Sequence, residues 1–600
     1  MEEDNLMADE EKDGKVDELT ARIQALTSTV EELSARLSRS SAPVAPPLSD
    51  STVNPADEED VGDLSEVTEE VLAWVGKASL LPRLSTLCFL LVVALGLRTL
   101  TDNGIVDTLP GSVLGMGYAA LLMLAGWRYY SKGSPLSPVL AACGAALMSI
   151  IVVETHSRFQ SLPLVPAYLT LMATGIIMAV ISYRFNVFTP ISTGTLGMCL
   201  AGAAIDYPSP FFPYLAMILW TANLLAFFAV RIRRSSWLRW IVLMVSLFML
   251  QLWGARLTIP PGSNEWATDA SSVAWFPPVL SIFVATYFAL SLAGIIRNGT
   301  ANSERFDYLL PVINCVWAFN IAIVTAHTWG TGDARVGLIG MLFALLHFGV
   351  AFWLAEQKKS TNAGINAFLF AGLTLTALAL PHATGTLLFS LPAVSAISIA
   401  LFFFSHRWRN GGTRIISYLG QLYAVAALII MLTGKGSSSL LLITLIPTGL
   451  LAVITLSHYL LARRYTPCGD SRFFSRLDRG DHSAVFILLA SLYSLFFFMR
   501  ISAYHLLLNA PGNLSNSYRC AQSIIINVGA AALMLIAAYR HNREIRNVAI
   551  LVTLVGGVNV FLFDLLGTHG MPLVLSVFTF GIVAALESIL LGRWHREPVP

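Results

Sequence analysis

The stretch PLVPAYLTLMATGIIMAVISY, residues 163–183, decides the fold class of this chain. It contains no Asp, Glu, Lys or Arg, and a basic residue, Arg184, follows it directly. A helix needs roughly 20 mostly apolar residues to cross the hydrocarbon core of a bilayer. These residues therefore predict a membrane-spanning helix that ends at a charged surface.

Similar stretches follow one another along most of the chain. Hydrophobic residues make up 55% of it and charged residues only 12%, whereas a soluble domain has about 45–50% and about 25%. The sequence therefore predicts an all-α fold, a polytopic transmembrane helix bundle of about eighteen spans. The predicted spans are 84–101, 111–129, 136–155, 163–183, 187–205, 211–230, 237–255, 273–296, 308–327, 336–355, 364–381, 385–405, 415–433, 438–462, 483–504, 518–540, 547–565 and 571–592. For the shortest, such as 187–205, a re-entrant segment is the alternative.

Lysine and arginine residues predict the orientation of these spans, because cytoplasmic loops carry an excess of them. With the N-terminus in the cytoplasm, the cytoplasmic connections include Arg231 to Arg239, Lys358 and Lys359, Arg463 to Arg479, and Arg540 to Arg546. The outer connections then hold only Arg98, Arg158, Arg256, Arg335, Lys435, Arg500 and Arg519. This alternation predicts an even number of spans with both termini in the cytoplasm.

The region before the first span has a different composition. Residues 1–13 form an acidic start that we predict to be disordered, and it lacks the basic and apolar parts of a signal peptide. Within 14–39, Val16, Leu19, Ile23, Leu26, Val30, Leu33 and Leu37 form a heptad seam. This seam favours a parallel two-stranded coiled coil, and an amphipathic helix packed on the same chain is the alternative. Residues 40–65, rich in Ser, Pro and acidic residues, predict a disordered linker. Residues 66–83 predict a juxtamembrane amphipathic helix, 84–592 the transmembrane domain, and 593–600 a cytoplasmic tail.

Several outward helix ends are alike in residue type. They are Glu154-Thr155-His156, His327-Thr328-Trp329-Gly330, His382-Ala383-Thr384-Gly385 and Gly567-Thr568-His569-Gly570. One interpretation is a set of helical hairpins that arose by duplication. The other is that polar residues and glycine simply end helices.

The order of these parts resembles that of a bacterial family of uncharacterised predicted membrane proteins, a domain of unknown function. The resemblance rests on the coiled coil, the Pro/Ser-rich linker, Gly76-Lys77-Ala78 before the first span, and the many spans with short connections. It covers nearly the whole chain. It implies a multi-pass protein of the bacterial cytoplasmic (inner) membrane, and it supplies no catalytic residues.

Ionisable residues gather at the predicted outer ends of the spans, where their insertion into the bilayer is costly. They form a candidate substrate-binding layer, in which Arg and His would hold an anionic group and Asp or Glu would accept protons. Interfacial caps and ion pairs are the alternative interpretation. The layer consists of Arg98, Asp102, Asp107, Glu154, His156, Arg158, Asp206, Arg256, His327, Asp333, Arg335, His382, Arg500, His505, Asp564 and His569.

These observations favour transport or handling of an envelope lipid or glycan through an outward-facing polar cavity. A non-catalytic scaffold or sensor that uses the coiled coil is one alternative, and a membrane-embedded transferase with a lipid-linked donor is another. An enzyme is the least favoured class, and catalytic residues stay unassigned. The six cysteines are scattered singly and no nucleotide or metal motif occurs, so we expect no cofactor and no metal. The expected partners are membrane lipids and a second chain or another protein bound through residues 16–37. A net charge of +1 gives no basic surface for nucleic acid.

Overall fold

A computed structural model describes residues 89–90, 92–96, 98–101, 103–207, 211–232, 237–258, 270–298, 305–357, 362–433, 442–467, 471–509 and 513–594. The chain divides into two units, Met1–Leu80 and Leu81–Pro600, and all described residues belong to the second. The predicted acidic start, coiled coil, linker and juxtamembrane helix therefore lie outside the described residues, as do Asp102 and most of the C-terminal tail.

Seventeen helices in the described part are long and apolar enough to cross a membrane, and no strand occurs there. They confirm the all-α polytopic fold, and each matches a predicted span. The helices are α4 (Thr108–Ser131), α5 (Ser137–Ser157), α6 (Leu164–Phe185), α7 (Phe188–Asp206), α8 (Phe212–Ala229), α9 (Trp237–Leu257), α10 (Ala270–Asn298), α11 (Arg305–Thr325), α12 (Asp333–Glu356), α13 (Asn362–Thr384), α14 (Leu387–Arg407), α15 (Gly411–Thr433), α16 (Leu445–Arg464), α18 (Ser483–Leu507), α19 (Leu514–Arg540), the combined α20–η4–α21 (Arg543–Val558, Asn559–Asp564 and Leu565–Gly567) and α22 (Met571–Trp594).

Two predicted spans differ in outcome from the rest. Span 84–101 is described only at 89–90, 92–96 and 98–101, where a short apolar helix, Val92–Thr101, occurs. Span 187–205 is the continuous helix α7 of 19 residues. A helix of this length needs no re-entrant turn, because at 1.5 Å per residue it is about 28 Å long.

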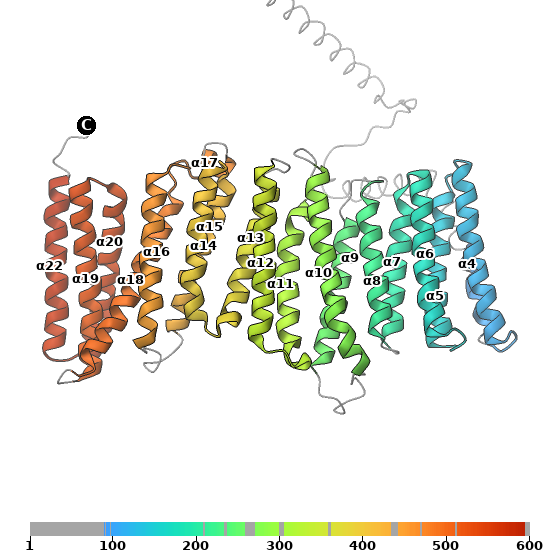
Figure 1. The fold of residues 1–600 in the computed structure, drawn as a ribbon, viewed down its shortest axis with the longest axis horizontal. Helices are drawn as coiled ribbons and strands as arrows, with labels where there is room; N and C mark the ends of the chain where they lie inside the picture. Colours follow the sequence, from blue (N-terminus) through green and yellow to red (C-terminus); the bar gives the residue numbers. More distant parts are fainter. Residues whose placement is uncertain are drawn as a thin grey trace, which may run out of the picture. The chain divides into compact units, whose positions relative to one another are not determined.

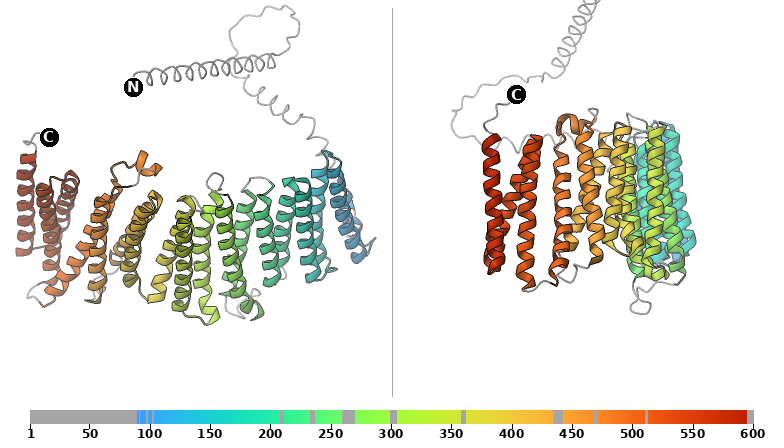
Figure 2. Two further views of the ribbon diagram at one scale, coloured as in Figure 1. Left: turned by 45° about the horizontal axis from the view of Figure 1, so that its top comes forward. Right: turned by 60° about the vertical axis from the view of Figure 1, so that its left-hand side comes forward.

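Successive helices run in opposite directions, and from α4 to α18 they follow one another roughly in sequence order, while α19 lies beside α22 (Figures 1 and 2). Substantial contacts join each helix to helices no more than three further along the chain, such as α5 to α7, α11 to α13, and α19 to α22. Two short helices, η1 (Ala326–Trp329) and α17 (Arg472–Arg476), lie in connections, and η3 (Leu442–Thr444) precedes α16. The described helices thus stack by neighbour contacts, as repeats do in a solenoid.

Small residues let the most extensively packed pairs approach closely. On α12, a Cβ added at Gly337 would lie 2.4 Å from the backbone nitrogen of Ala383 on α13. Between α4 and α5, a Cβ at Gly126 would lie 2.9 Å from the backbone nitrogen of Ala141. Glycine and alanine serve this purpose in membranes, because helix association there depends on van der Waals contact.

The alternation of helix directions defines two ends of this unit. The basic end contains the connections rich in Arg and Lys, among them the segment with α17, which is uppermost in Figure 1. The opposite end contains η1 and the connection between α21 and α22. The sequence predicts that the basic end faces the cytoplasm.

Candidate functional site

At the opposite end, the predicted polar layer separates into local groups on different helices. Arg98 forms an ion pair of 2.8 Å with Glu154 at the end of α5. This pair lines a cavity of about 40 Å³ together with Thr101, Ser112 and Thr155. Such a cavity has room for water, but it is too small for a lipid or a sugar.

Asp206 and Arg256 form a second group, buried between α7 and α9. Arg256 Nη1 lies 3.8 Å from Asp206 Oδ2, and Trp253 Nε1 donates a hydrogen bond of 2.9 Å to the same oxygen. The backbone amide of Phe211 donates to Oδ1 at 3.2 Å. The carboxylate thus joins the end of α7 to α9 and to the connection before α8, which is a structural role.

The other residues of the layer make separate local contacts. His327 Nε2 lies 3.6 Å from Asp333 Oδ1 in an exposed pair. Arg500 Nε donates to the Tyr518 hydroxyl at 2.7 Å, and the ring of His382 packs against Phe319. Asp107 precedes α4, and Arg158 follows the last residue of α5. His156 Nδ1 lies 2.9 Å from the carbonyl oxygen of Leu162, and the ring of His505 packs on Tyr504. Arg335 and His569 are exposed. The contacts therefore do not join these side chains into one shared cavity in the described part.

Asp564 has the most unusual setting in the layer. It is 1% exposed and ends η4, a π-helical segment within a membrane span. The hydroxyls of Ser523 on α19 and Ser576 on α22 both donate to Asp564 Oδ2, and Asn559 Nδ2 donates to Ser523 Oγ at 2.7 Å. Short π-helical segments within α-helices are frequent at functional sites.

A groove is lined by residues of the same two helices and by Leu507 of α18. Its volume is about 440 Å³, within the range of roughly 300–1,000 Å³ of small-molecule sites. Met571, Val574 and Phe578 line it and are exposed on the membrane-spanning surface. Its lining is almost wholly apolar: Leu507, Ser517, Cys520, Ala521, Ile524, Met571, Pro572, Val574, Leu575 and Phe578.

Sequence reasoning missed a second buried carboxylate in the last three helices. Glu587 of α22 is 6% exposed and accepts a hydrogen bond of 2.5 Å from Thr553 Oγ1 on α20. No ion pair joins Asp564 or Glu587 to a basic residue in the part of the chain that the structure describes. The signal was present in the sequence, since Glu587 is an acidic residue inside the apolar run 571–592.

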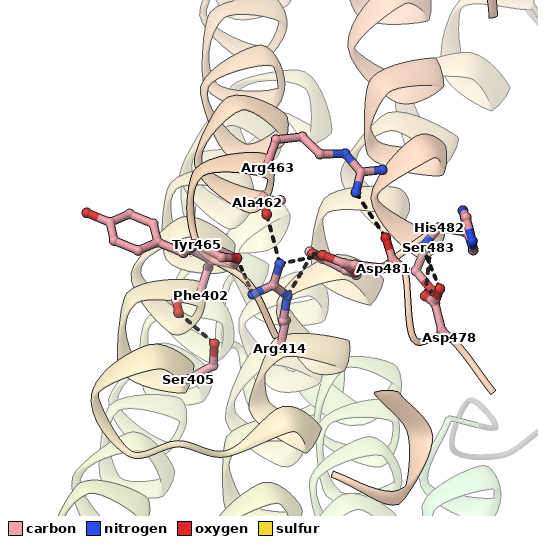
Figure 3. Close-up of polar contacts among 12 residues, drawn as sticks. Phe402, Ser405, Arg414, Ala462, Arg463, Tyr465, Asp478, Asp481, His482 and Ser483 are labelled. Carbon is pink, nitrogen blue, oxygen red and sulfur yellow. Dashed lines mark hydrogen bonds and ion pairs between the residues drawn. The ribbon is translucent and has the colours of Figure 1, made fainter. Parts of the chain in front are cut away.

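Two buried ion pairs nearer the basic end were also missed. Arg239 Nη1 lies 2.7 Å from Asp307 Oδ1, joining α9 to α11. Arg414 of α15 pairs with Asp481, and its guanidinium also donates to the carbonyls of Ala462 and Tyr465 at the end of α16 (Figure 3). A cation at a helix C-terminus satisfies carbonyls that have no partner within the helix. Arg414 therefore fixes how α15, α16 and the start of α18 fit together.

The two aspartates before α18 differ in their electrostatics. Burial raises the pKa of Asp481, an effect that the nearby Arg414 partly offsets. Burial also acts to raise the pKa of Asp478, but hydrogen bonds from Ser483 and from the amides of Ser483 and His482 outweigh it and lower the pKa below its ordinary value. Asp478 is therefore held as a carboxylate at the start of α18, where the helix dipole favours a negative charge.

A further polar group lies deeper among α14, α15 and α16. His458 Nδ1 lies 3.2 Å from Gln421 Oε1, and Gln421 Nε2 donates to Ser395 Oγ at 2.7 Å. All three side chains are fully buried. Polar contacts of this kind hold membrane helices together, and we interpret this group as structural.

No group of three or more His, Cys, Asp or Glu side chains suited to a metal ion occurs among the described residues. No family model, no curated protein and no solved structure matches this chain. A function therefore has to be inferred from the geometry alone, and α18 to α22 offer the strongest features.

Proposed function

We propose that this chain is a transporter that handles a lipid-type molecule of the cell envelope at the groove between α19 and α22. The observation that carries the proposal is the groove itself, an apolar space of about 440 Å³ between membrane-spanning helices, whose α22 side is formed by exposed side chains such as Met571 and Phe578. A site of this kind is entered from the hydrocarbon of the bilayer. Its natural ligand is therefore the apolar chain of a membrane lipid.

The position of the groove indicates the leaflet from which a lipid would enter it. The groove extends inward from the opposite end, where Leu507 ends α18 and Met571 begins α22. Ser517 is the polar residue of its lining. A lipid chain in the groove would thus have its headgroup at the predicted outer surface. If both termini lie in the cytoplasm, as proposed from the sequence, the ligand would belong to the outer leaflet of the bacterial cytoplasmic membrane.

A crosslinking experiment tests lipid binding directly. The full-length chain is reconstituted in phosphatidylethanolamine and phosphatidylglycerol vesicles that contain a trace of phosphatidylglycerol with a diazirine in its acyl chain. After illumination, mass spectrometry should locate crosslinks on the groove, around Ile524 and Phe578, in excess of those on other exposed positions such as Val528. Equal labelling over all lipid-facing helices would contradict the proposal.

Transport is tested with the same vesicles and a fluorescent phosphatidylglycerol, whose outer-leaflet fraction is bleached by dithionite. Ala521→Trp fills the groove and should lower the rate of lipid translocation by about tenfold or more, whereas Val528→Trp, on the lipid-facing side of the same helix, should leave it unchanged. A tenfold change corresponds to about 1.4 kcal/mol in the barrier. Equal rates for both variants would show that the groove has no part in translocation.

A further inference from the structure

The last three spans contain two buried carboxylates at different depths. Asp564 contacts Ser576 of α22. Glu587 lies eleven residues beyond Ser576 on the same helix, which is a distance of about 16 Å at 1.5 Å per residue. Asp564 lies toward the opposite end, and Glu587 lies toward the basic end. Acidic residues inside a bilayer are costly and commonly serve as stations for protons.

Polar side chains line the half of this interval nearer Asp564 at steps of about one helical turn, and Thr553 lies at the Glu587 end. Ser523 and Asn527 are four residues apart on α19, and Ser576 and Thr579 are three apart on α22. Thr553 on α20 and Asn559 at the start of η4 each lie three residues from Gly556. Residues three or four apart share a helix face. Asn527 Nδ2 donates to Thr579 Oγ1 at 3.2 Å, so the middle of the interval is polar on both α19 and α22.

The amide oxygen of Asn527 is the most informative atom in this interval. Asn527 is 1% exposed, and its Oδ1 has no hydrogen-bond partner. It faces Gly556, where an added Cβ would lie 2.7 Å from this oxygen. A buried acceptor without a donor is costly. Because residue 556 is glycine, it presents no side chain to this oxygen.

We propose that Glu587, Asn527 and Asp564 form a path for protons through the α19, α20 and α22 group. The O–H bond of protonated Glu587 breaks, and the proton passes to a water molecule. The resulting hydronium ion moves past the Asn527 oxygen. It then gives its proton to the Asp564 carboxylate, where a new O–H bond forms. Asp564 releases it beside Thr568, whose buried hydroxyl is also without a partner, toward the exposed His569. The path requires no occupant of the groove, so it stands apart from the proposed transport of lipid.

Few other ionisable groups face this path. Residues 523–538 of α19, 547–563 of α20 and η4, and 571–586 of α22 contain no titratable side chain. Near Asp564 are the thiol of Cys520 and the guanidinium of Arg519, which donates to the carbonyl of Gly567. On the side of α18, Arg500 donates to Tyr518. Near Glu587, the closest cation along α20 is Arg546, two turns before Thr553. The carboxyl groups of Asp564 and Glu587 are therefore the main titratable groups along this path.

Proton flux under an imposed potential tests the path. The full-length chain is reconstituted in phosphatidylethanolamine and phosphatidylglycerol liposomes loaded with KCl and pyranine, and valinomycin sets an inside-negative potential in low-potassium buffer. The wild type should acidify the lumen faster than liposomes without protein. Asp564→Asn and Glu587→Gln should each lower this flux by about tenfold or more, as expected when a proton-transfer group is removed.

Gly556→Val and its control Gly581→Val separate the path from general disruption. Valine at 556 intrudes on the Asn527 oxygen and should also lower the flux by about tenfold, while a Cβ at the exposed Gly581 meets nothing within 4 Å and should leave it unchanged. Asn527→Leu is the second variant at the middle station. Dicyclohexylcarbodiimide, which reacts with protonated carboxyls in apolar surroundings, should still label Asp564 and Glu587 in Gly556→Val, which shows that the fold is kept. A wild-type flux no greater than that of liposomes without protein, or full flux in Asp564→Asn or Glu587→Gln, would overturn the path.

Discussion

Single side chains decide whether a buried charge in this protein is structural. Arg414 is 3% exposed and pairs with Asp481 while also donating to two carbonyls of α16. Arg407 also forms an ion pair, of 3.2 Å with Glu356, but both side chains are largely exposed. Arg407 is the last residue of α14 and Arg414 lies in the first turn of α15, so they form a matched pair for mutation.

Arg414→Met should destabilise the protein by about 3–5 kcal/mol, because it leaves the buried Asp481 without its cation. Arg407→Met should cost no more than about 1 kcal/mol, as for other exposed pairs. Unfolding in mixed micelles with increasing dodecyl sulfate, followed by circular dichroism, measures both free energies. Similar losses in the two variants would show that Arg414 does not have the structural role described above.

At the scale of helices, close approach depends on glycine at particular positions. Gly337→Ala places a methyl group 2.4 Å from the backbone of α13, and relief requires the two helices to move apart. We expect a loss of about 1–3 kcal/mol, as for other overpacked interfaces. Gly349→Ala on the same helix meets nothing within 4 Å and should be neutral or stabilising by up to about 1 kcal/mol, because alanine favours helix.

The same unfolding experiment measures both glycine variants. A larger loss at Gly349 than at Gly337 would mean that α12 and α13 are not in the close contact described. Since both substitutions add one methyl group to the same helix, any difference between them reports the helix interface.

The sequence predicted the helices because length and apolar composition alone determine a membrane span. It could not predict pairs such as Arg98 with Glu154 or Arg239 with Asp307, since these depend on how helices rotate and pack. Asp564 was among the predicted residues, but the π-helical turn that buries it between two serines has no sequence signature. Glu587 was not predicted because it lies apart from the ionisable residues that gather at the outer ends of the spans, although an acidic residue within an apolar run is itself a signal.

At the scale of the whole molecule, the alternation of basic connections predicts which end faces the cytoplasm. Reporter fusions at Arg234, Lys359, Arg476 and Arg543 should report the cytoplasm, because these connections carry most of the Lys and Arg residues. Fusions at Asn264, Gly332 and Gly512 should report the outside. Two adjacent fusions on the wrong side would overturn the predicted orientation and the even number of spans.

The neighbour-only packing of the helices bears on how this protein is made. A ribosome delivers spans in sequence order, and each span needs as partners only those delivered shortly before or after it. Synthesis interrupted after α16 would already have supplied every substantial partner of the helices up to α13. Assembly can thus keep pace with translation, and a defective late span would spoil its own vicinity while the earlier part of the protein stays intact.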